Sequence, residues 1–288
     1  MKKDSIFITG ATGMLANTWY INCKKKYNPF LLHNKKIKGK NLIQIDYFNL
    51  DKFSKIIKKF DVKLIIHTAG MTNVEKCEFD KKKALNSNLF LTKAITKVAS
   101  KNNVKIIYIS TDHIFDGKHK RGYSETSKTC PLNNYAKTKL LSESFIKKNL
   151  KNFIIIRTNF FGKSFAKKKS FSDIILRNLK SGKKLTLFDD IFFNPISMNE
   201  LVKVSMKMYE KSMNGIFNIG TKKIISKFEF GKQLAKHYGL NKNLILKTKI
   251  KKKVTLKRPS SMFLKISKLE NKIKFNSSLK KNFFLAGH

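Results

Sequence analysis

Tyr135 and Lys139, which stand four positions apart, are the side chains in this sequence best suited to proton transfer. On an α-helix that spacing places both side chains on one face. An ammonium near a phenol stabilises the phenolate and lowers the pKa of the phenol, so the phenol becomes a usable acid or base near neutral pH. Thr111 follows an apolar run and is expected at the end of a parallel strand, where such sheets bind ligands. Its hydroxyl could hold a substrate carbonyl while Tyr135 protonates the oxygen, so we expect these three residues to be catalytic.

A glycine-rich turn, Gly10 to Gly13, separates the first apolar run from the first helical pattern. Gly10 permits a tight turn, and Gly13 lets the backbone approach a pyrophosphate closely. Ala16 allows the following helix to pack against the strand. The backbone amides of Gly13, Met14 and Leu15, at the start of this helix, would then face the phosphate charge. The turn therefore predicts a dinucleotide-binding site.

The end of the second expected strand bears on the choice of dinucleotide. An acidic residue there would hydrogen-bond the ribose of NAD and repel the 2′-phosphate of NADP. Here Asn34 is followed by Lys35 and Lys36, so we predict NADPH as the cofactor, with NADH as the open alternative. Asp46, at the end of the third strand, is expected to bind the adenine amino group, with Tyr47 beside it.

Apolar runs and amphipathic segments alternate through the first half of the chain. Strands are expected at residues 5–9, 29–33, 42–45, 63–68, 104–110 and 153–157, and helices at residues 14–25, 51–60, 84–100 and 135–148. This alternation predicts an α/β fold with a Rossmann-type, doubly wound parallel sheet. The rhythm loosens after residue 162. We therefore expect residues 1–162, with returning segments around 190–222, to form an NADP-binding domain, and residues 163–288 to form a smaller C-terminal substrate lobe.

The chain is strongly basic, because 62 Lys and Arg stand against 18 Asp and Glu and give a net charge of +44. Such a charge suits nucleic-acid binding. Only four of these residues are Arg, however, the side chain whose planar fork recognises phosphates and bases. The lysines are spread from end to end, so we expect compositional drift over a solvated surface and no specific nucleic-acid site.

Other features of the composition predict a cytoplasmic protein. No apolar run approaches the roughly 20 residues that span a bilayer, and the first short apolar run leads straight into glycines, unlike a secretory leader. Cys23, Cys77 and Cys130 are scattered, with no CxxC pair and no matching histidines. We therefore expect no disulfide framework, no zinc site and a reducing compartment.

Several segments resemble the motifs of one family. STDHIFDG at residues 110–117 is similar to STDYVFDG, YAKTK at 135–139 to YGxTK, RTNF at 157–160 to RTSW, and RPSS at 258–261 to RPxxS. Residues 67–78 are similar to the family's alanine-rich strand end, where the cofactor lies. Over nearly its whole length the chain thus resembles the extended short-chain dehydrogenase/reductases, and within them the dTDP-4-dehydrorhamnose reductases.

The resemblance implies roles for particular residues. Thr111, Tyr135 and Lys139 take the catalytic roles, and Asp112 and Phe160 join Thr111 in facing the sugar. The full set of expected cofactor-binding residues is Gly10, Gly13, Met14, Leu15, Asn34, Lys35, Asp46, Tyr47, Ala69, Gly70, Met71, Thr72, Tyr135 and Lys139.

The implied activity is NADPH-dependent reduction of a 4-keto-6-deoxy nucleotide-sugar, as in the biosynthesis of dTDP-rhamnose and of cell-surface polysaccharides. Departures from the family pattern leave the identity of the sugar and of the nucleotide base open. Phe160 replaces a tryptophan that packs on the sugar, and Asn194-Pro195-Ile196 replaces a Pro-Thr segment. The sequence shows no carboxylate cluster that would match a metal site.

Other functions of the same superfamily remain open. An epimerase or dehydratase is one, although dehydratases often carry Glu where His113 follows Asp112 here, which favours simple reduction. A non-catalytic NADP-binding regulatory subunit, as among relatives that bind methionine adenosyltransferase, is another, and the intact Tyr135 and Lys139 argue against it. The expected partner is a nucleotide-sugar, with neither membrane nor specific nucleic acid, and a homodimer is left open.

Overall fold

The computed structural model describes residues 3–35, 39–119, 121–250 and 256–288. The chain divides into two compact units. The first unit contains Met1–Ser110, Asn133–Ile156 and Met208–Ile216, and the second contains Thr111–Leu132, Arg157–Lys207 and Phe217–His288. The predicted functions of residues 1–162 and 163–288 stay predictions, because compactness does not show what a unit binds.

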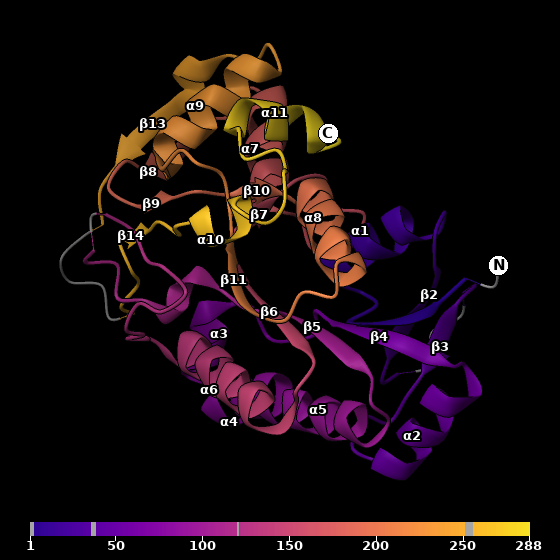
Figure 1. Cartoon of the computed structure of the whole chain (residues 1–288). Coiled ribbons are helices and arrows are strands. Elements are labelled where there is room, and N and C mark those ends of the chain that lie inside the picture. Colours follow the sequence, from indigo (N-terminus) through magenta and orange to yellow (C-terminus); the bar gives the residue numbers. More distant parts are fainter. Residues whose placement is uncertain (1–2, 36–38, 120, 251–255) are drawn as a thin grey trace. The chain divides into compact units, whose positions relative to one another are not determined.

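The central sheet has seven strands in the order β11-β6-β5-β4-β1-β2-β3 (Figure 1). The strands are β1 (Ser5–Thr9), β2 (Asn28–His33), β3 (Leu42–Gln44), β4 (Val62–His67), β5 (Lys105–Ile109), β6 (Phe153–Thr158) and β11 (Gly215–Ile219). Strands β1 to β6 pair in parallel. Strands β1 and β5 are buried at every position, as expected for strands covered on both faces. The predicted Rossmann-type, doubly wound parallel sheet is confirmed.

Helices cover both faces of this sheet. The helices of the first unit are α1 (Met14–Cys23), α2 (Leu50–Lys59), α3 (Val74–Phe79), α4 (Lys81–Ala84), α5 (Leu91–Lys101) and α6 (Asn134–Asn149). Figure 1 shows α2, α5 and α6 along one side of the sheet and α1 on the other. A π-helix, Leu85–Phe90, joins α4 to α5. The helix predicted at residues 84–100 is therefore present, but it contains a wider turn and is preceded by two short helices that the sequence pattern did not predict.

The second unit combines short sheets with helices. Its strands are β7 (Phe160–Phe161) with β10 (Ile196–Ser197), β9 (Phe192–Phe193) with β12 (Ile225–Ser226) and β14 (Ser261–Met262), and β8 (Leu185–Phe188) with β13 (Ile245–Thr248). Its helices are α7 (Phe171–Lys180), α9 (Lys227–His237), α10 (Ser267–Glu270), α11 (Leu279–Leu285) and most of α8 (Met198–Glu210). Phe230 lies at the centre of its core, with the Phe161 ring 5.0 Å away and the Phe193 and Phe283 rings each 5.5 Å away. Aromatic rings at such distances and in edge contact stabilise the unit beyond the area they bury.

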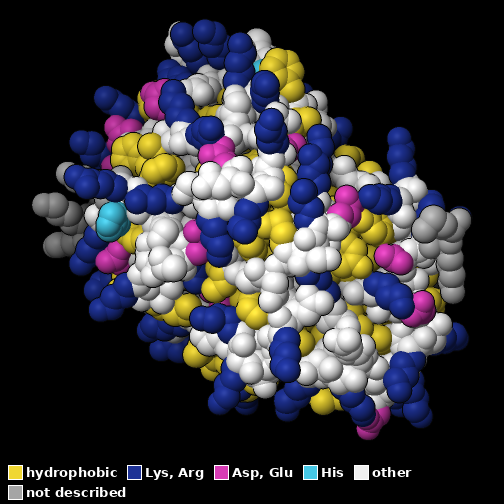
Figure 2. Space-filling model, in the orientation of Figure 1, with side chains coloured by type: hydrophobic (Ala, Val, Ile, Leu, Met, Phe, Trp, Pro, Cys, Tyr) yellow, Lys and Arg dark blue, Asp and Glu magenta, His cyan; other side chains and the backbone are white. Residues whose placement is uncertain are grey.

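The positive charge is distributed over the surface of the chain. Figure 2 shows Lys and Arg side chains scattered across one face, with few Asp and Glu between them. Of the helices that the structure describes, none combines the length and apolar character needed to cross a bilayer.

Candidate functional site

The glycine-rich turn between β1 and α1 has the backbone geometry that the sequence predicted. Gly10 adopts a positive φ of 81°, and a Cβ atom at this position would meet the Ala69 Cα at 3.0 Å. Gly13 donates its amide to the Gly10 carbonyl at 2.7 Å and is the N-cap of α1. No side chain caps this helix. The first turn of α1 therefore keeps backbone N–H groups that can bind an anionic ligand.

Hydrogen bonds fasten the carboxyl ends of β1 and β4 together beside this turn. The Thr9 hydroxyl accepts from the amides of Thr68 and Ala69 at 3.2 and 3.1 Å. The Thr68 hydroxyl donates to the Thr9 carbonyl at 2.7 Å. His67 bridges Thr9 and Thr92 through its two ring nitrogens at 2.8 and 2.9 Å. Burial, reinforced by the charge of Lys139, lowers the pKa of His67 to about 3, so this imidazole is a neutral packing group.

Asn88, which the sequence pattern did not single out, holds the segment that follows β4. Its Oδ1 accepts from the Met71 amide at 2.7 Å, and its Nδ2 donates to the Met71 carbonyl at 3.2 Å and to the Thr138 hydroxyl at 2.9 Å. A Cβ atom at Gly70 would meet the Asn88 Oδ1 at 2.7 Å. Asn88 thus links the predicted cofactor-binding segment from Ala69 to Thr72 with α6. It lies in the π-helix, a distortion that is frequent at functional sites.

The predicted catalytic pair lies near the start of α6, which is capped by Asn133. Tyr135 and Lys139 are both buried, at 9% and 8% exposed. The Lys139 Nζ donates to the Ile109 carbonyl, the last residue of β5, at 2.6 Å and lies 4.0 Å from the centre of the Tyr108 ring. The structure therefore fixes this ammonium at the carboxyl end of a central strand.

The electrostatic surroundings of Lys139 suit a group that exchanges protons near neutral pH. Burial lowers the pKa of Lys139 to about 7, although the carboxylate of Glu143 acts in the opposite direction. Glu143 is 1% exposed and accepts a 2.5 Å hydrogen bond from the Ser110 hydroxyl. A buried group with a pKa shifted toward neutrality is a frequent mark of an active site. Glu143 is a second residue that the sequence pattern did not single out.

The residues predicted to select the cofactor occupy different environments. Asn34 and Lys35 are exposed, as contacts to a 2′-phosphate require, while Lys36 lies outside the described residues. Asp46 is exposed, and its carboxylate accepts from the Phe48 amide at 3.0 Å. Tyr47 is 6% exposed and packs edge-on against Phe53 at 5.9 Å, so a core contact accounts for its burial.

Within the second unit, Thr111 and Asp112 form a compact polar turn. Thr111 follows Ser110 directly in the chain, and its hydroxyl accepts from the His113 amide and donates to Asp112, each at 3.2 Å. Asp112 is 1% exposed and accepts from the Asn159 side chain at 3.0 Å. Burial raises the pKa of Asp112 to about 6, against the lowering effects of its hydrogen bonds and of Lys227.

Two cations act on this turn from other segments of the second unit. Burial, Lys227 and Arg258 together lower the pKa of His113 to about 3, so the imidazole is neutral at pH 7. Burial also lowers the pKa of Lys227, which begins α9 with its Nζ 5.5 Å from the centre of the Phe171 ring. The sequence pattern did not single out Lys227, because one lysine among so many carries no signal.

Gly117 and Asn194, from two other motifs of the second unit, have structural roles. Gly117, at φ 77°, accepts from the Ser261 amide, and a Cβ atom there would meet the Ser260 nitrogen at 2.6 Å. Asn194 donates to the carbonyls of Thr221 and Leu264 at 2.8 and 2.9 Å.

Phe160, predicted to face the sugar, is half-buried in β7. Across the described ranges, no three His, Cys, Asp or Glu side chains group in a way that could hold a metal ion.

Known proteins are similar to this chain in sequence and in fold. A 150-residue segment is 30% identical to dTDP-4-dehydrorhamnose reductase of Shigella flexneri, and the match covers 52% of this chain and 50% of that protein. Methionine adenosyltransferase 2 subunit beta of Danio rerio is 26% identical over 284 residues, covering 92% of this chain and 84% of that protein. The crystal structure of Bacillus anthracis dTDP-4-dehydrorhamnose reductase in complex with NADP superimposes with a TM-score of 0.89 at 22% identity, over 99% of each chain, and so shows the same fold.

The family comparison extends over almost the whole sequence. The RmlD substrate binding domain matches residues 3–282, a span that includes the glycine-rich turn, the Tyr135–Lys139 pair and most of the second unit. The chain therefore belongs to the RmlD substrate binding domain family.

Proposed function

We propose that the chain is a cytoplasmic reductase that uses NADPH to reduce the keto group of a 4-keto-6-deoxy nucleotide-sugar, in the manner of a dTDP-4-dehydrorhamnose reductase. The observation that carries the proposal is the buried pair on α6. Lys139 is fixed on the Ile109 carbonyl, has a pKa of about 7, and stands one helical turn from Tyr135. A reductase of a carbonyl group needs such an arrangement, because the oxygen must receive a proton as the carbon receives a hydride.

The side chains of the site have separate tasks in this reaction. Tyr135 donates its phenolic proton to the carbonyl oxygen. Lys139 stabilises the resulting phenolate and holds the nicotinamide ribose. The Thr111 hydroxyl holds the carbonyl oxygen in place. The product is an alcohol, which carries the hydride on carbon and the tyrosine proton on oxygen.

The residues around α1 fit a dinucleotide. Gly10 leaves room for the close approach of Ala69, and the uncapped amides that follow Gly13 can bind a pyrophosphate. NADPH supplies the hydride when bound. We assign the adenine contact to Asp46, and the 2′-phosphate contact to the exposed Asn34 and Lys35, where no acid would repel it.

The second unit offers groups for the nucleotide-sugar. Lys227 and Arg258 both lower the pKa of His113, which means that two positive charges lie near the Thr111–Asp112 turn. We assign the diphosphate of the substrate to these two cations, since charge-assisted hydrogen bonds to phosphate are strong. Asp112 and Phe160 are then the contacts for the sugar, the aromatic ring shielding its methyl and C–H groups from water.

A regulatory function is the second candidate, and the match to the Danio rerio subunit over 92% of the chain favours it. Such a subunit would bind NADPH without reducing a sugar. The buried, hydrogen-bonded Lys139 argues for catalysis, because a buried ammonium costs stability that a merely binding protein has no need to lose.

The test is the variant Tyr135→Phe, assayed by NADPH oxidation with dTDP-linked and UDP-linked 4-keto-6-deoxy sugars. We expect turnover to fall by about 100-fold or more, since only the proton donor is removed, while NADPH binding stays near that of the wild type. The control Tyr20→Phe, at a half-buried position on α1, removes the same single oxygen and should leave turnover unchanged. Near-normal reduction by Tyr135→Phe would refute the mechanism. NADPH binding by the wild type without reduction of any of these sugars would favour the regulatory function.

A further inference from the structure

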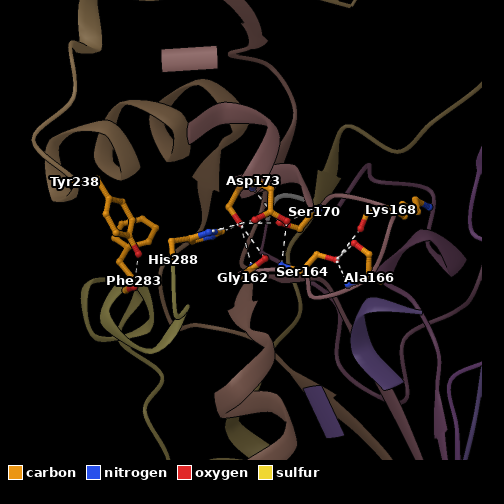
Figure 3. Close-up of polar contacts among 10 residues, drawn as sticks. Gly162, Ser164, Ala166, Lys168, Ser170, Asp173, Tyr238, Phe283 and His288 are labelled. Atoms are coloured by element: carbon orange, nitrogen blue, oxygen red, sulfur yellow. Dashed lines mark hydrogen bonds and ion pairs between the residues drawn. The ribbon is translucent and has the colours of Figure 1, made fainter. Parts of the chain in front are cut away.

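The beginning of α7, in the second unit, carries a hydrogen-bonded cluster that the proposed reaction does not use (Figure 3). The Asp173 Oδ2 accepts from the amides of Ser170 and Ser164 at 2.8 and 3.1 Å. Its Oδ1 lies 3.3 Å from the His288 Nδ1, and the Nε2 of the same imidazole lies 2.9 Å from the Ser172 hydroxyl. The two carboxylate oxygens of Asp173 therefore have three polar partners, namely Ser164, Ser170 and His288.

This combination of serine, histidine and aspartate has a structural role. A nucleophile must reach its substrate, but Ser172 has no exposed surface, and its hydroxyl accepts from the Gly162 amide at 3.0 Å. Ser164 donates to the Lys168 carbonyl at 2.6 Å and so fixes the loop before α7. The cluster thus holds in place the loop, the helix and residue 288.

A groove of about 480 Å³ lies against this cluster. Four cationic side chains line it, namely Lys163, Lys169, Arg177 and Lys180. Asp173 is the one acidic side chain among the lining residues. No ion pair found among the described residues involves any of the four cations. A cavity of this size can hold a small molecule.

Burial and the nearby charges of Lys163 and Lys180 lower the pKa of His288, although Asp173 raises it. The imidazole is therefore neutral at pH 7. The groove then presents four cationic side chains against a single acidic side chain, whose two oxygens already have partners.

Lysines also line other hollows of the surface, because the chain is rich in lysine. A pocket of about 600 Å³ in the first unit is lined by Lys26, Lys63 and Lys105. Lys26 pairs there with Glu210 at 2.8 Å, and Lys105 donates to the Met213 carbonyl at 2.7 Å. Lys63 pairs with Asp61 at 2.6 Å. A hollow of about 400 Å³ lined by Lys3, Lys24 and Lys40 also has no ion pair among the described residues. The groove beside α7 differs from both hollows because it has a fourth cation and because that cation, Arg177, is one of only four arginines in the chain.

The groove also lies apart from the residues proposed to bind the nucleotide-sugar. Phe171, whose ring is near Lys227, is the first residue of α7. At about 100° of rotation per residue, Lys180 lies about 180° around the helix from Phe171, and Arg177 about 240°. The groove is therefore on the opposite face of α7 from Lys227.

We propose that the α7 groove is a second anion site, which binds a compact ligand carrying two or three linked phosphates. The planar fork of Arg177 can bind a phosphate through two hydrogen bonds, and the three ammonium groups supply compact charges for its neighbours. The hydrogen bonds of Ser164 and Asp173 fix the backbone of the loop and of the start of α7, from which these side chains extend, and this reduces the part of the ordering cost that the backbone would contribute. A hollow of this volume suits a small oligophosphate better than the extended backbone of a nucleic acid.

The experiment is a calorimetric titration of inorganic triphosphate into the full chain at about 50 mM salt, where charge contacts are weakly screened. The variant Arg177→Gln/Lys180→Gln removes two exposed charges that are three positions apart on α7. Its control, Lys52→Gln/Lys55→Gln, removes two exposed charges at the same spacing on α2. We expect the groove variant to bind triphosphate about tenfold more weakly and the control to bind like the wild type.

Other results would overturn the proposal. Absence of triphosphate binding by the wild type, or an equal loss of affinity in the two double variants, would mean that only the general surface charge attracts phosphate. A single-stranded RNA that displaces triphosphate at equal phosphate concentration would assign the groove to nucleic acid. NADPH titration of the groove variant should match that of the wild type, and a loss there would place Arg177 and Lys180 in the cofactor site.

Discussion

Replacing Lys139 by methionine should make the folded chain more stable while it abolishes reduction. Burial lowers the pKa of Lys139 from 10.5 to about 7. Because a pKa difference of one corresponds to about 1.4 kcal/mol, the charged form costs the fold on the order of 5 kcal/mol. Methionine fills a similar volume without a charge, but it leaves the Ile109 carbonyl without its donor, which costs about 1–3 kcal/mol. We therefore expect the variant to be more stable at pH 6 by about 2–4 kcal/mol.

The pH dependence of this difference is the sharper prediction. Below pH 7 the ammonium of Lys139 is charged in both the folded and the unfolded chain, so the full cost of burying it is present. Between pH 7 and 10.5 the unfolded chain keeps a proton that the folded chain has released, so the stability of the wild type rises with pH relative to that of the variant. One such proton corresponds to a slope of at most about 1.4 kcal/mol per pH unit, or about 2 kcal/mol between pH 7 and 9.

Urea unfolding of both proteins at pH 6, 7, 8 and 9 measures this difference directly. Lys137→Met, an exposed lysine on the same helix, serves as the control. Its ammonium lies in water in both states, so its removal should shift the stability curve without changing its pH dependence. If the difference between wild type and Lys139→Met is constant from pH 6 to 9, the folded protein does not hold Lys139 as a group that titrates near pH 7, and the electrostatic argument for its role fails.

Two further predictions concern specificity. The wild type should bind NADPH more tightly than NADH. Asn34→Asp, at an exposed position, should shift the ratio of the two dissociation constants toward NADH by about tenfold, because a carboxylate there repels the 2′-phosphate. Fluorescence titration measures both constants, and a wild-type preference for NADH would contradict the assignment. Phe160→Ala should lower kcat/KM for the keto-sugar by about fivefold, on the order of 1 kcal/mol, and weaken nucleoside diphosphate binding less. Equal losses in the two measurements would mean that Phe160 supports the fold or the nucleotide and not the sugar.

The features that the sequence predicted well depend on local patterns. Apolar runs that alternate with amphipathic segments are sufficient to predict a parallel sheet, and β1 to β6 lie within a few residues of the expected ranges. The turn at Gly10 follows from the same local chemistry, because only glycine readily takes its positive φ beside Ala69. Tyr135 and Lys139 share a helix, so their relation could be inferred from their spacing.

The features that the sequence did not reveal depend on contacts between distant segments. Asn88 lies 17 residues from Met71 and 50 from Thr138, and nothing in its neighbours along the chain marks those partners. Lys227 acts electrostatically on Asp112 and His113, which lie in a distant segment of the chain. Lysine is too common in this sequence for one such residue to be noticed. The short helices α3 and α4 cover a charged stretch whose start is set by the side-chain caps Asn73 and Asp80, with no apolar periodicity to show them.

The π-helix at Leu85–Phe90 contacts the segment from Ala69 to Thr72, which is predicted to bind the cofactor, so the number of residues in this helix matters as well as their chemistry. A π turn contains one residue more than an α turn. In this turn the Asn88 carbonyl accepts from the Leu91 amide and from the hydroxyls of Thr92 and Ser142, while the Asn88 side chain holds Met71. Deleting one residue of the turn would close it to an α turn, which covers about the same rotation with one residue fewer, so α5 would keep its orientation while the residues within the turn shift. Asn88 would then move away from Met71 and Thr138, so the additional residue of this turn positions the segment that is predicted to bind the cofactor.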